Sequence, residues 1–596
     1  MDSPPDLRAF LEDLRRAGEL AEIDVEVDPD LELSEIHRRV IADGGPALLF
    51  KRVKGFDSPT VTNLFGTQSR VERAFGRWPE RFVAEVARLG EELMPPTAAK
   101  LWRKRSLFAS LARIGTRRVR RAPVLEQSEP PRLTRVPALK TWPRDGGRFL
   151  TLPLVYTEHP ESHVSNLGIY RMQIYGDEHA GLHTQIGKGG GFHLAAAEAL
   201  GQPLPVNVHL GGPPALILSA IAPLPENVPE LLLASLLLKR RLRLTKNPAG
   251  PLPLIAESEL ALVGEVAPAA RRPEGPFGDH YGYYSEVHDY PLFHCKAVLR
   301  RRDAIVPATV VGKPRQEDFF LGDYLQELLS PLFPLVMPGV KDLWSYGETG
   351  YHSLAAAIVR ERYKREAMVS AFRILGEGQL ALTKFLLVTD RPVDLHDFPA
   401  TLAHVLARAD FRTDLFLFAN LAMDSLDYAG PRINEGSKGV LLGLGEPIRD
   451  LPREFQPLAD PPRDVRAARV FCPGCLVIEG PSYAADRDAA SRLAAHPAFA
   501  AWPLLVLSDD AARAVQTPMT FLWTTFTRFD PARDLHGARV ELVHGHASFT
   551  PPVLLDARMK PGYPEELECD EATKALVDRR WKEYAVRVLS PVSSHR

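Results

Sequence analysis

Residues 165–193 read SNLGIYRMQIYGDEHAGLHTQIGKGGGFH, so one short segment combines an amide, an arginine, a lysine, histidines and a run of glycines. The segments around it, FLTLPLVYT, PVNVHLGG, LPLIAESELALVGEVAP and HCKAVLRR, have the apolar, β-branched character of strands, with few helices between them. The middle of the chain is therefore predicted to be a β-dominated barrel that carries a polar site.

The segments on either side predict mixed α/β structure. Residues 7–17 place apolar side chains at helical spacing, with Gly18 at the expected C-cap, and AEIDVEV (21–27) then alternates as a half-buried strand would. From about residue 316, the helical patterns DYLQELLSPLF and SLAAAIVRERYKREAMVSAF are interleaved with the strands KFLLVTD, DLFLFA and GVLLGL. These patterns predict one α/β domain before the barrel and another after it.

The chain of 596 residues is too long for one hydrophobic core, and we expect several domains. The predicted division is an N-terminal α/β domain (1–125), a barrel (126–315), a C-terminal α/β oligomerisation domain (316–450), a further α/β segment of uncertain role (451–555) and a tail (556–596). The basic, proline-bearing stretch 117–137 is interpreted as a linker, and a helix near 318–332 is expected to join the domains. We find no internal repeat in the sequence.

The composition excludes several classes of protein. Hydrophobic residues make up 45% and charged residues 25%, as in ordinary globular chains, and the net charge of −2 disfavours binding to nucleic acid. The opening residues lack the apolar core of a signal peptide, and four cysteines are too few for a disulfide framework. We expect a cytoplasmic protein with at most peripheral membrane association.

Two features of the sequence can carry chemistry, and each has an ordinary alternative. Gly189, Gly190 and Gly191 can turn backbone amides toward a phosphate beside Lys188, although glycine runs are often simple loops. In APAARRPEGPFGDHYGYYSEVHDYP (267–291), Glu274 and Asp279 flank a Pro-Phe-Gly turn. If they converge, burial and like charge are expected to raise one pKa and create a proton donor; otherwise they are exposed loop acids.

Four motifs together resemble the UbiD decarboxylase family: N-x-G-I-Y-R, G-K-G-G-G-x-H, P-E-G-P-F-G-D-H-x-G-Y-Y and L-T-K-F-L-L-V-T-D. The similarity runs from about residue 5 to about residue 445. It implies an α+β multidomain fold in which an N-terminal α/β domain precedes a central, flavin-reductase-like split β-barrel. A linker helix then leads to a C-terminal α/β domain.

The resemblance also implies roles for individual residues. Arg171 matches the arginine that meets the substrate carboxylate, Glu274 completes its network, and Asp279 matches the acid that protonates the product carbon. The implied cofactors are prenylated FMN and Mn2+ or Mg2+, with K+ as a further ion. Asn166, His193 and Glu230 match the metal ligands, and His183 competes with His193 for that role. The residues expected at the cofactor are Ile169, Tyr170, Arg171, His183, Thr184, Gln185, Lys188, Gly189 and Lys384.

The activity that the resemblance implies is a reversible, non-oxidative decarboxylation of an aromatic or α,β-unsaturated acid through a covalent adduct with prenylated FMN. Quinone biosynthesis, of ubiquinone or menaquinone, is the expected context. The expected partners are the small-molecule acid, a flavin prenyltransferase that supplies the cofactor, and further copies of the chain in a dimer or hexamer. Where H-W-Q is common in the family, this chain has His183-Thr184-Gln185, which puts the shape of the substrate in doubt.

Two other functions stay open at this point. One is a plain FMN-dependent reductase, because split barrels also hold unmodified FMN. The other is a non-catalytic subunit that carries the cofactor or assists assembly, with 451–555 as its docking surface. Cys472-Pro-Gly-Cys475 has the spacing of half a zinc site, but no second pair exists to complete one, so a structural role is favoured.

Overall fold

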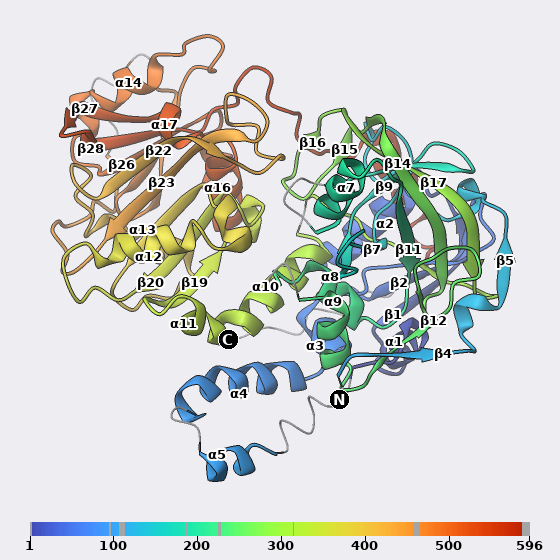
Figure 1. Cartoon of the computed structure of the whole chain (residues 1–596). Coiled ribbons are helices and arrows are strands. Elements are labelled where there is room, and N and C mark those ends of the chain that lie inside the picture. Colours follow the sequence, from blue (N-terminus) through green and yellow to red (C-terminus); the bar gives the residue numbers. More distant parts are fainter. Residues whose placement is uncertain are drawn as a thin grey trace. The chain divides into compact units, whose positions relative to one another are not determined.

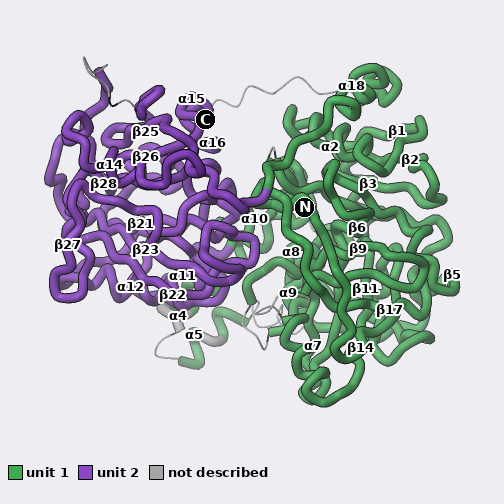
Figure 2. Tube along the Cα trace, turned by 90° about the horizontal axis from the view of Figure 1, so that it is seen from above, with its two compact units in different colours: residues 1–328, 565–596 green, residues 329–564 purple. Residues whose placement is uncertain are grey.

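The computed structural model describes residues 3–93, 97–105, 114–184, 189–224, 228–313, 315–456, 462 and 464–586. Two compact units are formed, one by residues 1–328 with 565–596 and the other by residues 329–564 (Figure 2). The last part of the chain therefore returns to the first unit.

The first unit opens with the predicted α/β layer. Helix α1 (Leu7–Arg16) starts at Asp6, whose carboxylate accepts from the Ala9 amide, and Gly18 follows it with a positive φ. A four-stranded sheet has the order β1 (Leu20–Val27), β2 (Ala47–Val53), β3 (Thr60–Thr62) and β18 (Val306–Pro307), with α2 (Glu32–Ala42) between β1 and β2 along the chain. The predicted helix, strand and second helix are confirmed here.

The C-terminal helix α18 (Glu571–Arg580) packs against α2. Arg580 pairs with the buried Glu32, and the Tyr584 hydroxyl donates to the same carboxylate at 2.7 Å. The remaining helices before the central sheet are α3 (Gln68–Phe75), α4 (Trp78–Leu93) and α5 (Ala98–Arg103).

A nine-stranded antiparallel sheet forms the centre of the first unit (Figure 1). Its order is β6 (Phe149–Leu150), β9 (Met172–Ile174), β10 (His179–Leu182), β17 (His288–Arg300), β14 (Leu260–Glu274), β11 (Leu204–Leu210), β7 (Leu154–Glu158) and β8 (Ser165–Ile169), with β5 (Gln127–Glu129) also paired to β17. In the described part of the chain β6 and β8 do not pair, so the sheet is a curled half-barrel. The expectation of a mixed α/β multidomain fold is confirmed at this level.

Three helices pack against the edge strand β8, namely α7 (Gly189–Ala199), α8 (Ala215–Ile221) and α9 (Glu230–Leu237). Smaller pieces complete the unit. A three-stranded sheet contains β13 (Leu254–Ile255), β12 (Leu242–Thr245) and β4 (Thr116–Val119), and β15 (Phe277–Gly278) pairs with β16 (Tyr284–Ser285). Helix α10 (Glu317–Leu329) lies where the linker helix is predicted, and its linking role stays a prediction.

The second unit contains two five-stranded sheets. The first has the order β19 (Val340–Ser345), β20 (Leu354–Val359), β21 (Phe385–Thr389), β23 (Glu435–Gly443) and β22 (Leu415–Ala422). The second has the order β24 (Ala467–Cys472), β25 (Cys475–Glu479), β26 (Leu504–Ser508), β28 (His546–Asp556) and β27 (Leu535–Val543). Both sheets follow the same path, so the expectation that the chain has no internal repeat is wrong at the level of structure.

One hydrophobic core lies between the two sheets. It takes residues from both sheets and from α13 (Phe398–Leu406) and α16 (Pro518–Phe526). The opposite faces are covered by α12 (Glu366–Ile374) on the first sheet and α14 (Ala489–Ala494) on the second. The helices α11 (Phe333–Val336), α15 (Ala511–Ala514) and α17 (Pro531–Asp534) are short.

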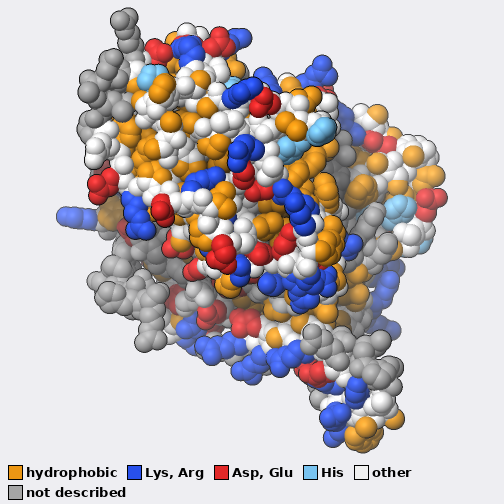
Figure 3. All heavy atoms as spheres, turned by 90° about the vertical axis from the view of Figure 1, so that its left-hand side faces the viewer, with side chains coloured by type: hydrophobic (Ala, Val, Ile, Leu, Met, Phe, Trp, Pro, Cys, Tyr) orange, Lys and Arg blue, Asp and Glu red, His pale blue; other side chains and the backbone are white. Residues whose placement is uncertain are grey.

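The outer side of the second unit also carries apolar side chains. Figure 3 shows hydrophobic atoms gathered among charged ones on the left-hand side of the view in Figure 1. On the edge strand β27, Val540, Leu542 and Val543 are exposed. The shared core is therefore not the only apolar surface of this unit.

Two other predictions can now be compared with the structure. The stretch 117–137 is not a free linker, because β4 joins the three-stranded sheet and β5 pairs with β17. Its proline and arginine content indicated a connection, but its short strands find partners far along the chain. Cys472 and Cys475 flank a Pro-Gly turn with Gly474 at positive φ, and both thiols are buried, as the structural interpretation predicts.

Candidate active site

The curled sheet brings distant residues together at the ends of β9, β10 and β14. Leu182 pairs with Met172, so Arg171 and His183 are neighbours, and the His183 amide donates to the Arg171 carbonyl at 3.1 Å. Glu274 is the last residue of β14, and it reaches the same end of the sheet because β17 lies between β14 and β10. Strand order, and not sequence spacing, therefore positions the group.

Arg171 is the centre of this group. Its Nε and Nη2 donate to the two oxygens of Glu274 at 2.9 and 3.3 Å, and Nη1 pairs with Oδ2 of Asp279. Nη2 also donates to the Ser285 hydroxyl at 3.0 Å, and the Phe277 ring lies 4.5 Å from the guanidinium carbon. All three charged side chains are buried, so the alternative of exposed loop acids is excluded.

The charges of these acids differ from the expectation. Burial alone would raise the pKa of Glu274, but the Arg171 guanidinium and His183 outweigh it, and the pKa falls below its ordinary value. Burial also opposes ionisation of Asp279, yet Arg171 and His280 lower its pKa strongly. The prediction that one of the pair has a raised pKa is therefore wrong, because Arg171 lies between the two carboxyl groups.

His183 lies beside this ion network, in surroundings that favour its neutral form. Its Nδ1 lies 2.8 Å from Oε2 of Glu274, and its ring lies 4.1 Å from that of Tyr290. Burial is the first cause that lowers the pKa of His183, and Arg171 adds to it. Since Nδ1–H donates to the carboxylate, Nε2 has a free lone pair, and this buried atom has no hydrogen-bond partner among the described residues. The atom is therefore available to a donor on a ligand.

The loop that carries Asp279 is fixed by residues that the sequence analysis missed. Asp145 accepts from the Gly278 amide at 2.8 Å and also from the amides of Thr141 and Trp142. A Cβ at Gly278 would lie 2.1 Å from the Trp142 ring, so only glycine fits there. Ser285, which binds Arg171, lies inside the second quoted segment, whereas no motif in the sequence marks Asp145.

The three predicted metal ligands gather at the edge formed by β7 and β8. Asn166 pairs with Thr157 across these strands, and the Thr157 hydroxyl lies 2.8 Å from His193 Nδ1, which leaves Nε2 for coordination. One oxygen of Glu230 accepts from the Leu167 amide at 2.9 Å. Within the described part of the chain, the buried Nδ2 of Asn166 has no hydrogen-bond partner.

This set consists of an amide, an imidazole and a carboxylate, which fits Mn2+ or Mg2+ in its chemistry. The described residues contain no group of three or more His, Cys, Asp and Glu side chains arranged for a metal. A metal here would therefore depend on the amide oxygen and on oxygens from the cofactor. His183 is held by Glu274 and not by these residues.

Four more of the predicted cofactor residues lie in the described part of the first unit. Ile169 is the last residue of β8, Tyr170 follows it, and Thr184 lies just after β10. Gly189 begins α7, and a Cβ at this position would lie 2.0 Å from Oδ1 of Asn166. The Tyr170 hydroxyl accepts from the Gly190 amide at 3.1 Å. Gln185 and Lys188 lie outside the described residues.

Lys384 belongs to the second unit, just before β21. Its Nζ lies 2.7 Å from Oδ2 of Asp427, and both side chains are almost fully buried. Lys438 lies nearby, and burial lowers its pKa to about 8. The role of Lys384 at a cofactor phosphate stays a prediction.

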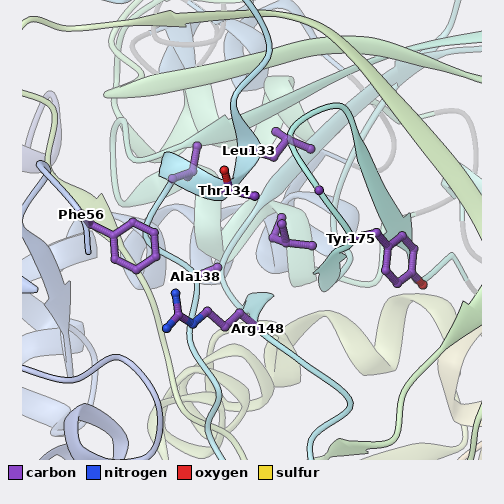
Figure 4. A pocket seen from close by; sticks show the side chains of 9 residues that line it. Phe56, Leu133, Thr134, Ala138, Arg148 and Tyr175 are labelled. Carbon is purple, nitrogen blue, oxygen red and sulfur yellow. The ribbon is translucent and has the colours of Figure 1, made fainter. Parts of the chain in front are cut away.

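An open cavity of about 230 Å³ also exists in the first unit (Figure 4). Its lining consists of Phe56, Leu133, Thr134, Val136, Ala138, Arg148, Ile174, Tyr175 and Gly176. Arg148 is already paired with Asp30 at 2.7 Å, and none of the described site residues lines the cavity. It is therefore distinct from the group around Arg171.

No helix in the described part of the chain is long and apolar enough to cross a membrane.

Comparison with known proteins gives three family matches in chain order. They are the N-terminal domain (residues 11–89), the Rift-related domain (117–314) and the C-terminal domain (319–443) of 3-octaprenyl-4-hydroxybenzoate carboxy-lyase, UbiD. The third match ends with β23, so everything from β24 onward lies outside it.

Relatives of similar length come from chlamydiae. A Chlamydia trachomatis protein described as uncharacterized is 52% identical over 97% of this chain and 99% of its own length. A Chlamydia pneumoniae protein, named as one of the subunits of a 4-hydroxybenzoate decarboxylase, is 50% identical over 97% of this chain and 98% of its own. Among solved structures, the UbiD-class enzyme HmfF of Pelotomaculum thermopropionicum, in complex with FMN, matches with a TM-score of 0.62 and 25% identity. That match covers 97% of HmfF but 76% of this chain.

Proposed function

Because the chain belongs to the UbiD family of carboxy-lyases, we propose that it removes CO2 reversibly and without oxidation from an aromatic or α,β-unsaturated carboxylic acid. The observation that supports this most is the buried Arg171, held between Glu274 and Asp279 beside a neutral His183. A guanidinium that is already oriented in a dry site suits a planar carboxylate. We place the substrate carboxylate at the Nη1 side of Arg171.

Substrate binding and proton donation are coupled through this arginine. A carboxylate that takes the Nη1 donor displaces Asp279 from the partner that lowers its pKa. Without Arg171 the pKa of Asp279 rises, because only nearby histidines, His280 first among them, still oppose the effect of burial, and the group can take up a proton. When the bond to the carboxyl carbon breaks and CO2 leaves, Asp279 gives this proton to the product carbon.

Glu274 keeps Arg171 in place during this exchange. It holds Nε and Nη2 with both oxygens and is itself completely buried. His183 adds the donor Nδ1–H to the same carboxylate, which leaves its Nε2 available to a ligand. These contacts fix the geometry of the site before the substrate arrives.

Prenylated FMN, when bound, supplies the electron sink that accepts the electron pair of the broken bond. Ile169, Tyr170, Thr184 and Gly189 are the described residues that we assign to its binding. Asn166, His193 and Glu230 would hold Mn2+ or Mg2+ beside its phosphate. The HmfF structure was determined with FMN, which supports a flavin in this fold.

The proposed substrate is a hydroxybenzoate or a related acid of quinone biosynthesis. The name of the Chlamydia pneumoniae relative and the description of the family models both support a hydroxybenzoate-type acid. We further propose that a flavin prenyltransferase supplies the cofactor and that the protein works in the cytoplasm.

Co-expression with a flavin prenyltransferase tests this function. Protein supplied with Mn2+ is assayed for CO2 release from hydroxybenzoates, naphthoates and acrylic acids, in parallel with protein loaded with plain FMN. The proposal predicts release that requires the prenylated flavin. Release with plain FMN would refute the role of the modified cofactor, and NAD(P)H oxidation without CO2 release would support a reductase.

A further inference from the structure

The two sheets of the second unit have the same topology. In both, the strand order is the same and the pairings along it run antiparallel, parallel, parallel and antiparallel. In both, one helix covers the outer face and another joins the shared core (Figure 1). We call residues 340–443 the first repeat and residues 467–556 the second repeat.

The register of the strands confirms the equivalence residue by residue. In the first repeat, Leu387 pairs with Leu441, and both face the shared core; in the second repeat, Val506 pairs with Leu555 and both face it too. Their neighbours, such as Leu386 in the first repeat and Leu505 in the second, face the outer helices. The same positions therefore point inward in both sheets.

A short sequence signature accompanies this register. The loop after the inner helix reads R-x-D-x-x-x-D-L in both repeats, from Arg408 to Leu415 and from Arg528 to Leu535. In each loop the amide of the first aspartate donates to the carboxylate of the second, Asp410 to Asp414 at 2.8 Å and Asp530 to Asp534 at 2.7 Å. A duplication accounts for a shared topology, a shared register and a shared loop.

The repeats face each other as the subunits of a twofold dimer do. The loop of the second repeat reaches β23 of the first, where the Ala532 amide donates to the Ser437 hydroxyl at 2.8 Å. The loop of the first repeat reaches β28 of the second, where the Phe549 amide donates to the Phe411 carbonyl at 3.4 Å. The two bonds join different residue pairs, but in both the loop of one repeat contacts the last strand of the other, as the equivalent elements of an isologous interface do.

The second repeat lacks the charged groups that the first repeat carries at the equivalent positions. In the first repeat, the Gly439 amide donates to the Lys384 carbonyl. In the second repeat, the Val553 amide donates to the Pro503 carbonyl at the equivalent place. Prolines therefore stand at the positions of both lysines, Pro503 for Lys384 and Pro552 for Lys438. The loop that carries Asp424 and Asp427 between β22 and β23 is replaced by a tight His544-Gly545 turn.

The second repeat nevertheless contributes to the lysines of the first. The Ser437 hydroxyl, next to Lys438, donates to the buried Asp530. The ring of Phe529 lies 5.2 Å from Nζ of Lys384. At the equivalent position across the pseudo-twofold axis, Asp410 pairs within its own loop, with Arg412 at 2.8 Å, and Pro551 stands where the first repeat has Ser437.

We propose that the second repeat is a duplicated C-terminal domain that acts as a built-in partner, with Asp530 as the residue that positions Ser437 and the two buried lysines of the first repeat. It follows that the apolar face of the first sheet is covered within the chain and is not available to a second copy. The part that Lys384 plays toward a flavin phosphate rests on the proposed function; the positioning by Asp530 does not.

Four variants of the full chain test this proposal. Asp530→Ala and Ser437→Ala remove the same hydrogen bond from opposite sides, and Asp530→Asn keeps an oxygen that accepts from Ser437. Asp410→Ala is the matched control at the equivalent position. Labelling of Lys384 and Lys438 with an amine reagent is followed by mass spectrometry, together with FMN affinity.

We expect both alanine variants at this bond to label about tenfold faster at these two lysines, because a buried hydrogen bond is lost. Asp530→Asn and Asp410→Ala should label as the wild type does. FMN should bind more weakly to the two alanine variants Asp530→Ala and Ser437→Ala, and with wild-type affinity to the other two variants. If Ser437→Ala labels like the wild type, or Asp410→Ala labels as fast as Asp530→Ala, the proposal is wrong. Failure of the wild type to bind FMN would count against the proposed function alone, since the labelling result does not depend on flavin.

Discussion

Arg171 and Asp279 form a buried ion pair through Nη1 and Oδ2, and this pair keeps Asp279 ionised before a substrate is present. The same donor is the one that a substrate carboxylate would use. In the proposed function, arrival of the substrate changes the proton affinity of Asp279, the acid that we expect to protonate the product. This arrangement and its surroundings have measurable consequences.

Arg171→Lys should abolish turnover and destabilise the first unit. Lysine is a point charge without the planar fork, so it cannot bind Glu274 with two nitrogens and Asp279 with a third. Loss of one partner from a buried charge network costs about 3–5 kcal/mol. The melting temperature of Arg171→Lys measures the loss of stability. The control is Arg272→Lys, a substitution near the site but outside this network. Equal melting temperatures for the two variants would contradict this prediction.

Gly278→Ala should lower kcat while the protein stays folded. The new Cβ would lie 2.1 Å from the rigid Trp142 ring, so the loop that carries Asp279 must move. A shift of about 1 Å in a catalytic group costs about 100-fold in rate. The control is Gly176→Ala, where no atom of the described residues lies within 4 Å of the new Cβ. Full activity in Gly278→Ala would show that the position of this loop does not limit the reaction.

Acid should destabilise the protein through two buried histidines. Burial lowers the pKa of His37 and of His209 to about 3. A folded pKa below the unfolded value of about 6.5 stabilises the fold above that pH, and the contribution is lost as the pH falls from about 6.5 toward 3. The loss for each histidine is about 1.4 kcal/mol per pH unit.

Unfolding experiments between pH 7 and pH 5 check this slope. His209→Asn should reduce the pH dependence of the unfolding free energy by the equivalent of one proton, whereas His294→Asn, at a half-buried position on β17, should leave it unchanged. An unchanged slope in His209→Asn would mean that this side chain is not buried in its neutral form.

Glu230→Gln should weaken Mn2+ binding in the flavin-loaded protein. The carboxylate accepts from the amide of Leu167, the residue after Asn166, and is partly shielded from water, and burial raises its pKa. Replacement by an amide removes the charge that a divalent cation needs, and we expect an affinity at least about tenfold lower. Electron paramagnetic resonance of Mn2+ measures it, with Glu161→Gln on the exposed loop before β8 as control. Equal affinities would remove Glu230 from the metal site.

The motifs in the sequence identified the two segments that carry the site, but not the strands β8, β9 and β10 or the helix α7 within the first of them. The two quoted segments contain Arg171, Glu274, Asp279 and Ser285, and the structure places all four in contact. The direction of the pKa shifts was not predictable, because linear spacing does not reveal that a guanidinium lies between the two acids. Asp145 was missed because it acts through backbone amides, and any short polar residue in a loop looks the same in sequence.

The repeat in the second unit was missed for a different physical reason. Its strands need only apolar residues at alternate positions, so Leu387 and Val506, or Ala356 and Val477, are equivalent without being identical. The residues that would reveal the duplication, Lys384 and Lys438, are prolines in the second copy. Strand order and register preserve a relationship that side-chain identity has lost.

Exchange of 13C-bicarbonate into the carboxyl group of an aromatic acid, by protein loaded with prenylated flavin and Mn2+, tests the central claim most directly. The wild type should exchange label into at least one hydroxybenzoate, and Asp279→Asn should lose this activity by at least about 100-fold because the proton-carrying group is gone. Asp289→Asn, an exposed acid on β17, should behave as the wild type does. Undiminished exchange in Asp279→Asn, or none by the loaded wild type with any acid of the panel, would contradict the account.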